Sequence, residues 1–170
     1  MPHFGPKEYP NSILSQSKDE EFRFRGPLAQ DFDAWFALYE KYAVDVKATV
    51  DRQIAGIVWG WFLDQHHPAE CVLLFTEEAL VGFAHFRPFP RTLNANEAGY
   101  LDDLYVCEHH RRRGLARALI EHVSKVGDAR GWSHLRWVAF EDNRRARRLY
   151  EEIAERSDLL TYIMPTCSRL

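Results

Sequence analysis

Short alternations of apolar and polar residues, and longer helical periods, divide the first half of the chain into elements. The segment 21–25, EFRFR, alternates as a strand does and is stopped by Gly26 and Pro27. From Asp31 the apolar spacing becomes helical, and a second helix is predicted over 50–63. The segments 70–78 and 79–89 then predict the two strands of a hairpin. These segments are apolar enough to supply the central part of a sheet.

The second half begins with a predicted loop, 88–99, followed by a strand over 100–106. A helix follows, because one apolar stripe recurs every three or four residues, and Gly131 is a typical helix stop. A strand over 134–140, a helix over 141–156 and a closing strand over 159–164 complete the pattern. The residues of the apolar stripe are Leu115, Leu119, Val123 and Val126.

This succession, β-α-α-β-β-β-α-β-α-β, predicts an α/β (α+β) fold in which a mixed sheet carries helices on its faces. The unit over 100–140 is expected to be a right-handed βαβ crossover. Residues 1–20 show no periodicity and are interpreted as a flexible N-terminal arm, which leaves a single domain over 21–170.

Composition narrows the class of protein. The chain has 170 residues, 46% of them hydrophobic, and a net charge of −3, which suits a soluble globular domain. The acidic balance weighs against a nucleic-acid binder. No apolar run is long enough to span a membrane, and the N-terminus does not resemble a signal peptide. Three cysteines without a CxxC pair favour the reducing cytoplasm.

A cluster of arginines stands where the helix after the strand 100–106 begins. Backbone N–H groups at a helix N-terminus attract anions, and small residues at Gly114 and Ala116 allow a close approach to the backbone. Cations oppose the positive end of the helix dipole, so their concentration here suggests a bound anion such as a phosphate. A solvated basic surface is the alternative. Neither the P-loop nor the GxGxxG spacing is present.

A second constellation lies in the segment 143–150, NRRARRLY. Asn143 opens a helix directly after a strand, and Tyr150 follows two turns later on the same face. An amide and a phenol would therefore share one site. The alternative is a helix-capping asparagine and a tyrosine of the core.

Taken together, these segments resemble the GCN5-related N-acetyltransferase (GNAT) family, which transfers an acetyl group from acetyl-CoA to an amine. Arg111, Gly114 and Ala116 match the family's Arg/Gln-x-x-Gly-x-Gly/Ala motif, and Asn143 and Tyr150, with Ala146 between them, match a later family motif. The intact resemblance covers about 73–164 and is nearest to the small-amine or diamine type. It implies a single GNAT-like domain with a mixed, mostly antiparallel sheet.

The resemblance also implies the residues that hold acetyl-CoA, the acetyl donor. The backbone of the arginine-rich turn would cradle the pyrophosphate, and the strand before it would pair with the pantetheine arm, with the amide near Val106 polarising the thioester carbonyl. Asn143 would bind the same arm, and Tyr150 would protonate the departing thiolate. The implied cofactor-binding residues are Leu104, Tyr105, Val106, Arg111, Arg112, Arg113, Gly114, Leu115, Ala116, Arg117 and Asn143.

Two neighbouring carboxylates, Asp102 and Asp103, lie in the strand 100–106. Strict alternation would let only one of them face the acceptor. Asp102 is favoured as the catalytic base or amine anchor, because the resemblance has an acidic residue at that position. An edge carboxylate or a salt bridge is the alternative. His85 is a minor candidate for substrate contact. No histidine or cysteine group has zinc-site spacing, so no metal is expected.

The sequence therefore predicts an N-acetyltransferase that acts on a small-molecule primary amine, such as a polyamine or an amino acid, by direct attack in a ternary complex. Two alternatives stay open: an acetyltransferase of protein lysine or N-terminal amines, and a non-catalytic CoA-binding module. Neither nucleic acid nor membrane is an expected partner. The resemblance favours a homodimer.

Overall fold

The computed structural model describes residues 7–9, 12–17 and 20–166. The chain divides into two compact units, Met1–Val138 and Ala139–Leu170. The sheet and the first three helices belong to the first unit, and the helix α4 belongs to the second.

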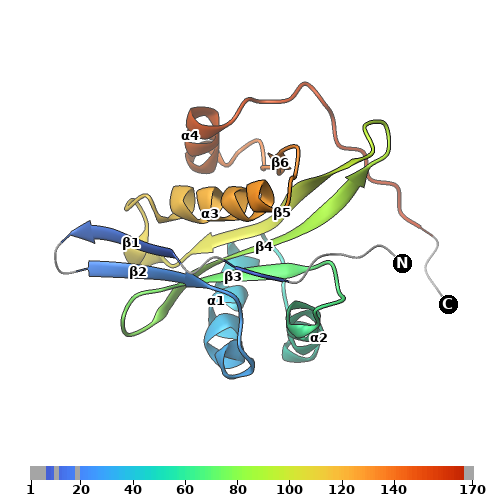
Figure 1. Cartoon of the computed structure of the whole chain (residues 1–170). Coiled ribbons are helices and arrows are strands. Elements are labelled where there is room, and N and C mark those ends of the chain that lie inside the picture. Colours follow the sequence, from blue (N-terminus) through green and yellow to red (C-terminus); the bar gives the residue numbers. More distant parts are fainter. Residues whose placement is uncertain (1–6, 10–11, 18–19, 167–170) are drawn as a thin grey trace. The chain divides into compact units, whose positions relative to one another are not determined.

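One six-stranded sheet forms the centre of the first unit, with its strands in chain order from β1 to β6 (Figure 1). Neighbouring strands run antiparallel except for β5 and β6, which are parallel. The sheet is thus mixed and mostly antiparallel, as expected. The strands are β1 (Ser12–Ser17), β2 (Glu20–Arg25), β3 (Glu70–Phe75), β4 (Leu80–Arg91), β5 (Asn96–Val106) and β6 (Leu135–Arg136).

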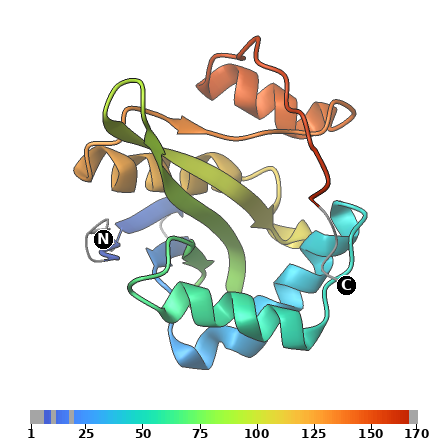
Figure 2. The ribbon, with the colours of Figure 1, turned by 90° about the vertical axis from the view of Figure 1, so that its right-hand side faces the viewer.

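Helices cover both faces of this sheet. Helices α1 (Phe32–Asp45) and α2 (Arg52–Leu63) lie against one face, and α3 (Leu115–Ala129) lies against the other (Figures 1 and 2). Two 3₁₀ turns, Ala29–Asp31 and Glu108–His110, precede α1 and α3. The parallel unit β5-α3-β6 corresponds to the predicted βαβ crossover.

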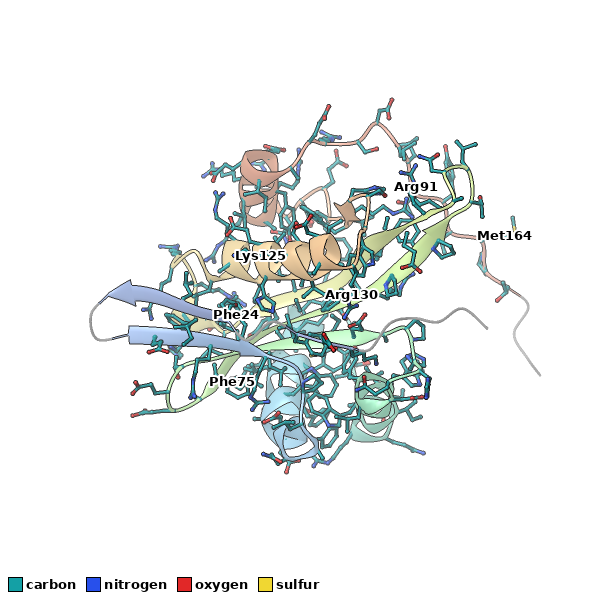
Figure 3. The ribbon with its side chains drawn as sticks, in the orientation of Figure 1. Phe24, Phe75, Arg91, Lys125, Arg130 and Met164 are labelled. Atoms are coloured by element: carbon teal, nitrogen blue, oxygen red, sulfur yellow. The ribbon has the colours of Figure 1, made fainter. Side chains whose placement is uncertain are left out.

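The core has one layer on each side of the sheet. Aromatic side chains dominate the layer under α1 and α2, where Trp35 and Phe83 are fully buried. The predicted stripe of α3 fills the other layer, since all four of its residues are at most 1% exposed. In Figure 3, Phe24 belongs to the α3 side, where it stacks on His122, and Phe75 belongs to the α1 side.

The β4–β5 hairpin is longer than the sequence predicts. The expected loop over 88–99 is wrong, because β4 continues to Arg91 and β5 begins at Asn96. Pro88 and Pro90 lie beyond the part of β4 that β3 accompanies, which ends at Phe86 opposite Glu70. Pro88 faces Gly99, whose N–H donates to the His134 carbonyl, just before β6, and not to β4, so the missing proline N–H removes no bond between β4 and β5.

The N-terminal and later strands also differ from the pattern. β1 lies inside the segment interpreted as a flexible arm, and it pairs with β2. The strand expected over 134–140 is only two residues long. Compared with the prediction, the sheet therefore has an additional first strand, β1, and a shorter last strand, β6.

The second unit contains α4 (Arg144–Ile153), whose N-cap Asn143 accepts the amide N–H of Ala146 at 3.1 Å. The closing strand expected over 159–164 is wrong, since the described residues after α4, up to Thr166, form no strand. Leu159 and Ile163 are 76% and 89% exposed. An apolar run becomes a strand only where a sheet edge is available to pair with it.

Candidate active site

The turn before α3 has an unusual backbone. Arg112 and Gly114 both adopt left-handed conformations, with φ of 65° and 73°. Gly114 is the N-cap of α3 and supplies no side-chain cap, and the first helical hydrogen bond runs from the Ala118 N–H to the Gly114 carbonyl at 3.0 Å. The helix therefore begins without the polar cap that would occupy the position of an anion.

The three arginines of this turn have different partners. The Arg111 guanidinium donates to the Val106 carbonyl at 2.9 Å and to the Asp45 carboxylate at 2.7 Å. Arg113 lies 5.1 Å over the ring of Phe22. Arg112 is exposed. Arg111 thus fastens the turn to the ends of β5 and α1, and its charge is already offset by a carboxylate.

The edge of β5 that faces β6 is only partly paired. Its ladder with β6 covers Gly99 and Tyr100 and then ends. The bond from the Cys107 N–H to the Val81 carbonyl, at 2.9 Å, makes Gly82 and Val106 a non-hydrogen-bonded pair with respect to β4. By the same alternation, the backbone groups of Leu104 and Val106 point to this edge, whereas those of Tyr105 point to β4.

A β-bulge places both candidate carboxylates on one face of the sheet. Asp103 pairs with His85 and Leu101 pairs with Phe86, so Asp102 is the extra residue. The Asp103 side chain contacts His85, and the Asp102 side chain contacts Arg87, two residues further along the same face of β4. The expectation that only one of them can face this side fails because the bulge interrupts the alternation.

Asp103 belongs to a chain of hydrogen bonds that crosses from α1 to β5. The Trp35 indole N–H donates to His85 Nε2 at 2.9 Å, and His85 Nδ1 lies 2.8 Å from Asp103 Oδ2. The Tyr42 hydroxyl donates to Asp103 Oδ1 at 2.5 Å. Because Nε2 must accept the indole proton, this network requires the neutral imidazole with its proton on Nδ1.

The two carboxylates have different acidities. Burial raises the pKa of Asp102 above its usual range, and nearby Arg87 only partly opposes that effect. Burial also acts on Asp103, but the interactions with His85 and Tyr42 outweigh it and hold the pKa below the usual range. With both oxygens of Asp103 engaged, Asp102 is the carboxylate better suited to accept a proton.

Asn143 and Tyr150 lie in the second unit, at the N-cap and on the second turn of α4. Asn143 is exposed and uses its side-chain oxygen to cap the helix. Burial raises the pKa of the Tyr150 phenol, which keeps its proton in place at neutral pH. Their roles toward acetyl-CoA remain predictions from the resemblance.

Other polar side chains of α1 and α2 are engaged in the fold. Asp51 caps α2 by accepting the Ile54 N–H at 2.8 Å, and Tyr39 packs among the aromatic side chains. Across the described parts of the chain, no three acidic, histidine or cysteine side chains gather in a way that would hold a metal. No described helix is long and apolar enough to cross a membrane.

Comparison with known proteins identifies the family. Residues 20–154 match the model of the Acetyltransferase (GNAT) family. The chain belongs to the GNAT family. A D-amino-acid N-acetyltransferase of Saccharomyces cerevisiae, HPA3, is 31% identical over 135 residues, which cover 78% of this chain and 84% of that protein. This GNAT protein is therefore an acyl-CoA-dependent acetyltransferase.

Solved GNAT structures have the same fold. A ribosomal-protein-alanine N-acetyltransferase from Brucella melitensis biovar Abortus 2308 superposes with a TM-score of 0.70 at 28% identity, covering 85% of this chain and 99% of that chain. The aminoglycoside N-acetyltransferase AAC(6')-Iy in complex with CoA gives a TM-score of 0.77 at 15% identity, covering 91% and 100%. The second likeness concerns the fold alone.

Proposed function

We propose that this GNAT protein transfers the acetyl group of acetyl-CoA to the primary amine of a small molecule, and that the turn 111–117 holds the pyrophosphate. The observation that carries the proposal is the left-handed turn at Arg112 and Gly114, which opens α3 without a side-chain cap. An anion bound there accepts from backbone N–H groups and gains from the helix dipole. The residues present thus fit a phosphate-bearing donor.

The pantetheine arm lies along the edge of β5 in this proposal. Leu104 and Val106 direct their backbone groups to that edge, where the ladder with β6 has ended. An extended arm with amide groups can bond there as an additional strand would. The Arg111 guanidinium already holds the Val106 carbonyl, so in this proposal the Leu104 backbone bonds to the arm.

Asp102 serves as the base for the acceptor amine. An alkylammonium ion must lose a proton before its nitrogen can attack, and a carboxylate with a raised pKa takes that proton more readily. The nitrogen lone pair then forms the C–N bond at the thioester carbonyl while the C–S bond breaks. A second nitrogen proton leaves to solvent, and the thiolate takes the proton of the Tyr150 phenol.

The acceptor amine is a small molecule, and the relationship to a D-amino-acid N-acetyltransferase supports amino acids among the candidates. The test is to incubate the protein with acetyl-CoA and a panel of polyamines and of D- and L-amino acids. Thiol release and the N-acetylated product are measured together. Tight acetyl-CoA binding without turnover on any amine would instead favour a non-catalytic CoA-binding module.

A protein amine is the second candidate acceptor. The likeness to a ribosomal-protein-alanine N-acetyltransferase supports it, at 28% identity over 85% of the chain. Peptides with a free N-terminal alanine, and the same peptides with a blocked N-terminus and one lysine, separate this candidate from small-molecule acceptors. If the protein acetylates such peptides in preference to every free amine, the acceptor is a protein amine and not a small molecule.

A homodimer in the cytoplasm completes the proposal. Helix α2 exposes Ile54, Ile57 and Trp61 at 53%, 54% and 43%, which are apolar side chains that a second copy could cover. Cys71 and Cys107 are free thiols, which suits a reducing compartment. Light scattering at several protein concentrations reports the molar mass directly.

A further inference from the structure

Beside the Asp102 carboxylate lies a positively charged side chain that the proposed chemistry does not use. Arg87 Nε lies 3.3 Å from Asp102 Oδ1 and 3.2 Å from Oδ2. The two side chains remain 42% and 36% exposed. A pair this exposed contributes roughly 0–1 kcal/mol to folding, so little stability is lost when its partners separate.

Aromatic rings position Arg87 and a second arginine on this face of the sheet. The guanidinium of Arg87 lies 4.8 Å over the ring of Tyr100, and that of Arg136 lies 5.5 Å from the same ring and 4.3 Å over Phe89. Stacking restricts each guanidinium without using all of its N–H donors. Donors therefore remain for a planar carboxylate.

The charges of this face do not suit a polycation. By the alternation of β4, Arg87 is on the same face as His85, and Arg136 joins it from β6. Strands β4 to β6 offer two carboxylates there, Asp102 and Asp103, and Asp103 has both oxygens bonded to Tyr42 and His85. One available carboxylate beside two arginines favours a ligand whose ammonium group is accompanied by a negative charge.

We propose that the acceptor is an amino acid or a similar zwitterion, with its ammonium group at Asp102 and its carboxylate at Arg87. This inference rests on the proposed function and names its substrate class. An α-amino acid carries its two charged groups one carbon apart, as the adjacent Asp102 and Arg87 groups require. Each group of the Arg87–Asp102 pair exchanges its partner for the oppositely charged group of the ligand. Arg87 is thus a specificity-determining residue, and a diamine of equal size is a poor acceptor.

Matched acceptors with and without a carboxylate test the inference. The full chain is assayed with acetyl-CoA and either phenylalanine, in both enantiomers, or phenethylamine, which is the same molecule without its carboxylate. Variants Arg87→Gln, Arg87→Lys and Arg91→Gln are compared with the unchanged protein. Arg91→Gln is the control, because it removes a positive charge from the same strand away from Asp102.

We expect Arg87→Gln to raise KM for phenylalanine by about tenfold to a hundredfold, as for a lost charge-assisted hydrogen bond, with a small effect on kcat. In Arg87→Gln, KM for phenethylamine should stay within about twofold of the unchanged protein. Arg87→Lys should restore part of the lost affinity for phenylalanine. Arg91→Gln should leave KM for both acceptors unchanged. An equal rise in KM for both acceptors would overturn the inference. Arg87 would then act through Asp102 or through the fold, and not through the carboxylate of the ligand.

The unchanged protein supplies a second criterion. Better turnover of phenethylamine than of either enantiomer of phenylalanine would overturn the zwitterion inference and leave N-acetyl transfer to amines intact. Acetylation of neither acceptor, nor of any other amine in the panel, would overturn both proposals together.

Discussion

His85 Nδ1 lies 2.8 Å from Asp103 Oδ2, and the opposite nitrogen of the same ring accepts the indole N–H of Trp35. One imidazole therefore connects α1, β4 and β5 directly behind the bulge that presents Asp102. Protonation of His85 would make Nε2 a donor that faces the indole N–H of Trp35, which is also a donor. The bulge is thus held by a neutral histidine and an ionised aspartate.

Replacement of His85 by Ala should destabilise the protein by about 3 kcal/mol, because it leaves the buried Trp35 N–H without an acceptor and opens a cavity. Urea unfolding followed by tryptophan fluorescence measures the loss. His66→Ala, at an exposed position after α2, is the control. A change below about 0.5 kcal/mol for His85→Ala, the range of an ordinary surface substitution, would contradict the role of the network.

Stability should fall as the pH drops from about 6.5 to about 4. His122 is buried, stacks on Phe24 and bonds through Nδ1 to Ser12 Oγ, and burial lowers its pKa to about 4. Between these two pKa values the unfolded chain binds more protons than the folded chain. The free energy of unfolding therefore rises with pH across this window, and the whole contribution of His122 is present above it. The contribution is at most about 3 kcal/mol.

Chemical unfolding at a series of pH values checks this dependence. His122→Gln should flatten the curve between pH about 4 and about 6.5, at the expense of stability at neutral pH. The exposed His66→Gln should leave the curve unchanged. An unchanged slope in His122→Gln would show that other groups cause the acid sensitivity.

The glycine of the turn before α3 has a matched partner at the end of the same helix. Gly114 and Gly131 have φ of 73° and 74°, so Ala at either position carries the same left-handed strain, roughly 1–2 kcal/mol. Only Gly114→Ala should weaken acetyl-CoA binding, by at least about tenfold, since only that residue belongs to the proposed phosphate turn. Calorimetric titration measures the binding. Equal affinities in the two variants would place the pyrophosphate elsewhere.

Tyr150→Phe should lower kcat by about a hundredfold or more, the loss typical of a general acid, while acetyl-CoA binding changes little. Tyr162→Phe, at a position 86% exposed, is the control for removal of a phenol from the same unit. Turnover and CoA affinity are measured separately. An unchanged kcat would make Tyr150 a structural residue.

Asp102→Asn should reduce kcat/KM about a hundredfold, because it removes the proposed base. In the unchanged protein kcat/KM should rise with pH through the pKa of Asp102, which lies above the usual value of about 3.9. The variant should lack this rise, and Asp128→Asn on the exposed face of α3 should retain it. A rise that persists in Asp102→Asn would assign the base to another group.

The sequence predicts the parts of the fold that depend on local periodicity. The stripe from Leu115 to Val126 predicts α3 and its buried face, and the glycine at 131 marks its end. The sequence predicts too short a β4–β5 hairpin, because Pro88 and Pro90 are typical of loops. Whether a proline disrupts a strand depends on whether its nitrogen faces a partner strand, and here β3 ends before it reaches Pro88.

The site is predicted only in part for the same reason. Glycine and arginine spacing indicates the turn at 111–114, because its geometry is local. The contacts of Asp102 with Arg87 and of Asp103 with His85 depend on a register shift between two strands, which no single strand encodes. The mostly apolar sequence over 159–164 likewise does not reveal whether a sheet edge is available for this segment to pair with.

The most direct test of acetyl transfer at this site is a stoichiometric mixture of the protein, acetyl-CoA and an acceptor amine from the panel. Mass spectrometry of the amine and of the intact protein is combined with a thiol assay. Direct transfer predicts equal amounts of free CoA and N-acetylated amine, with the mass of the protein unchanged. CoA release without acetylated amine, or an acetylated protein that forms before the product, would contradict it.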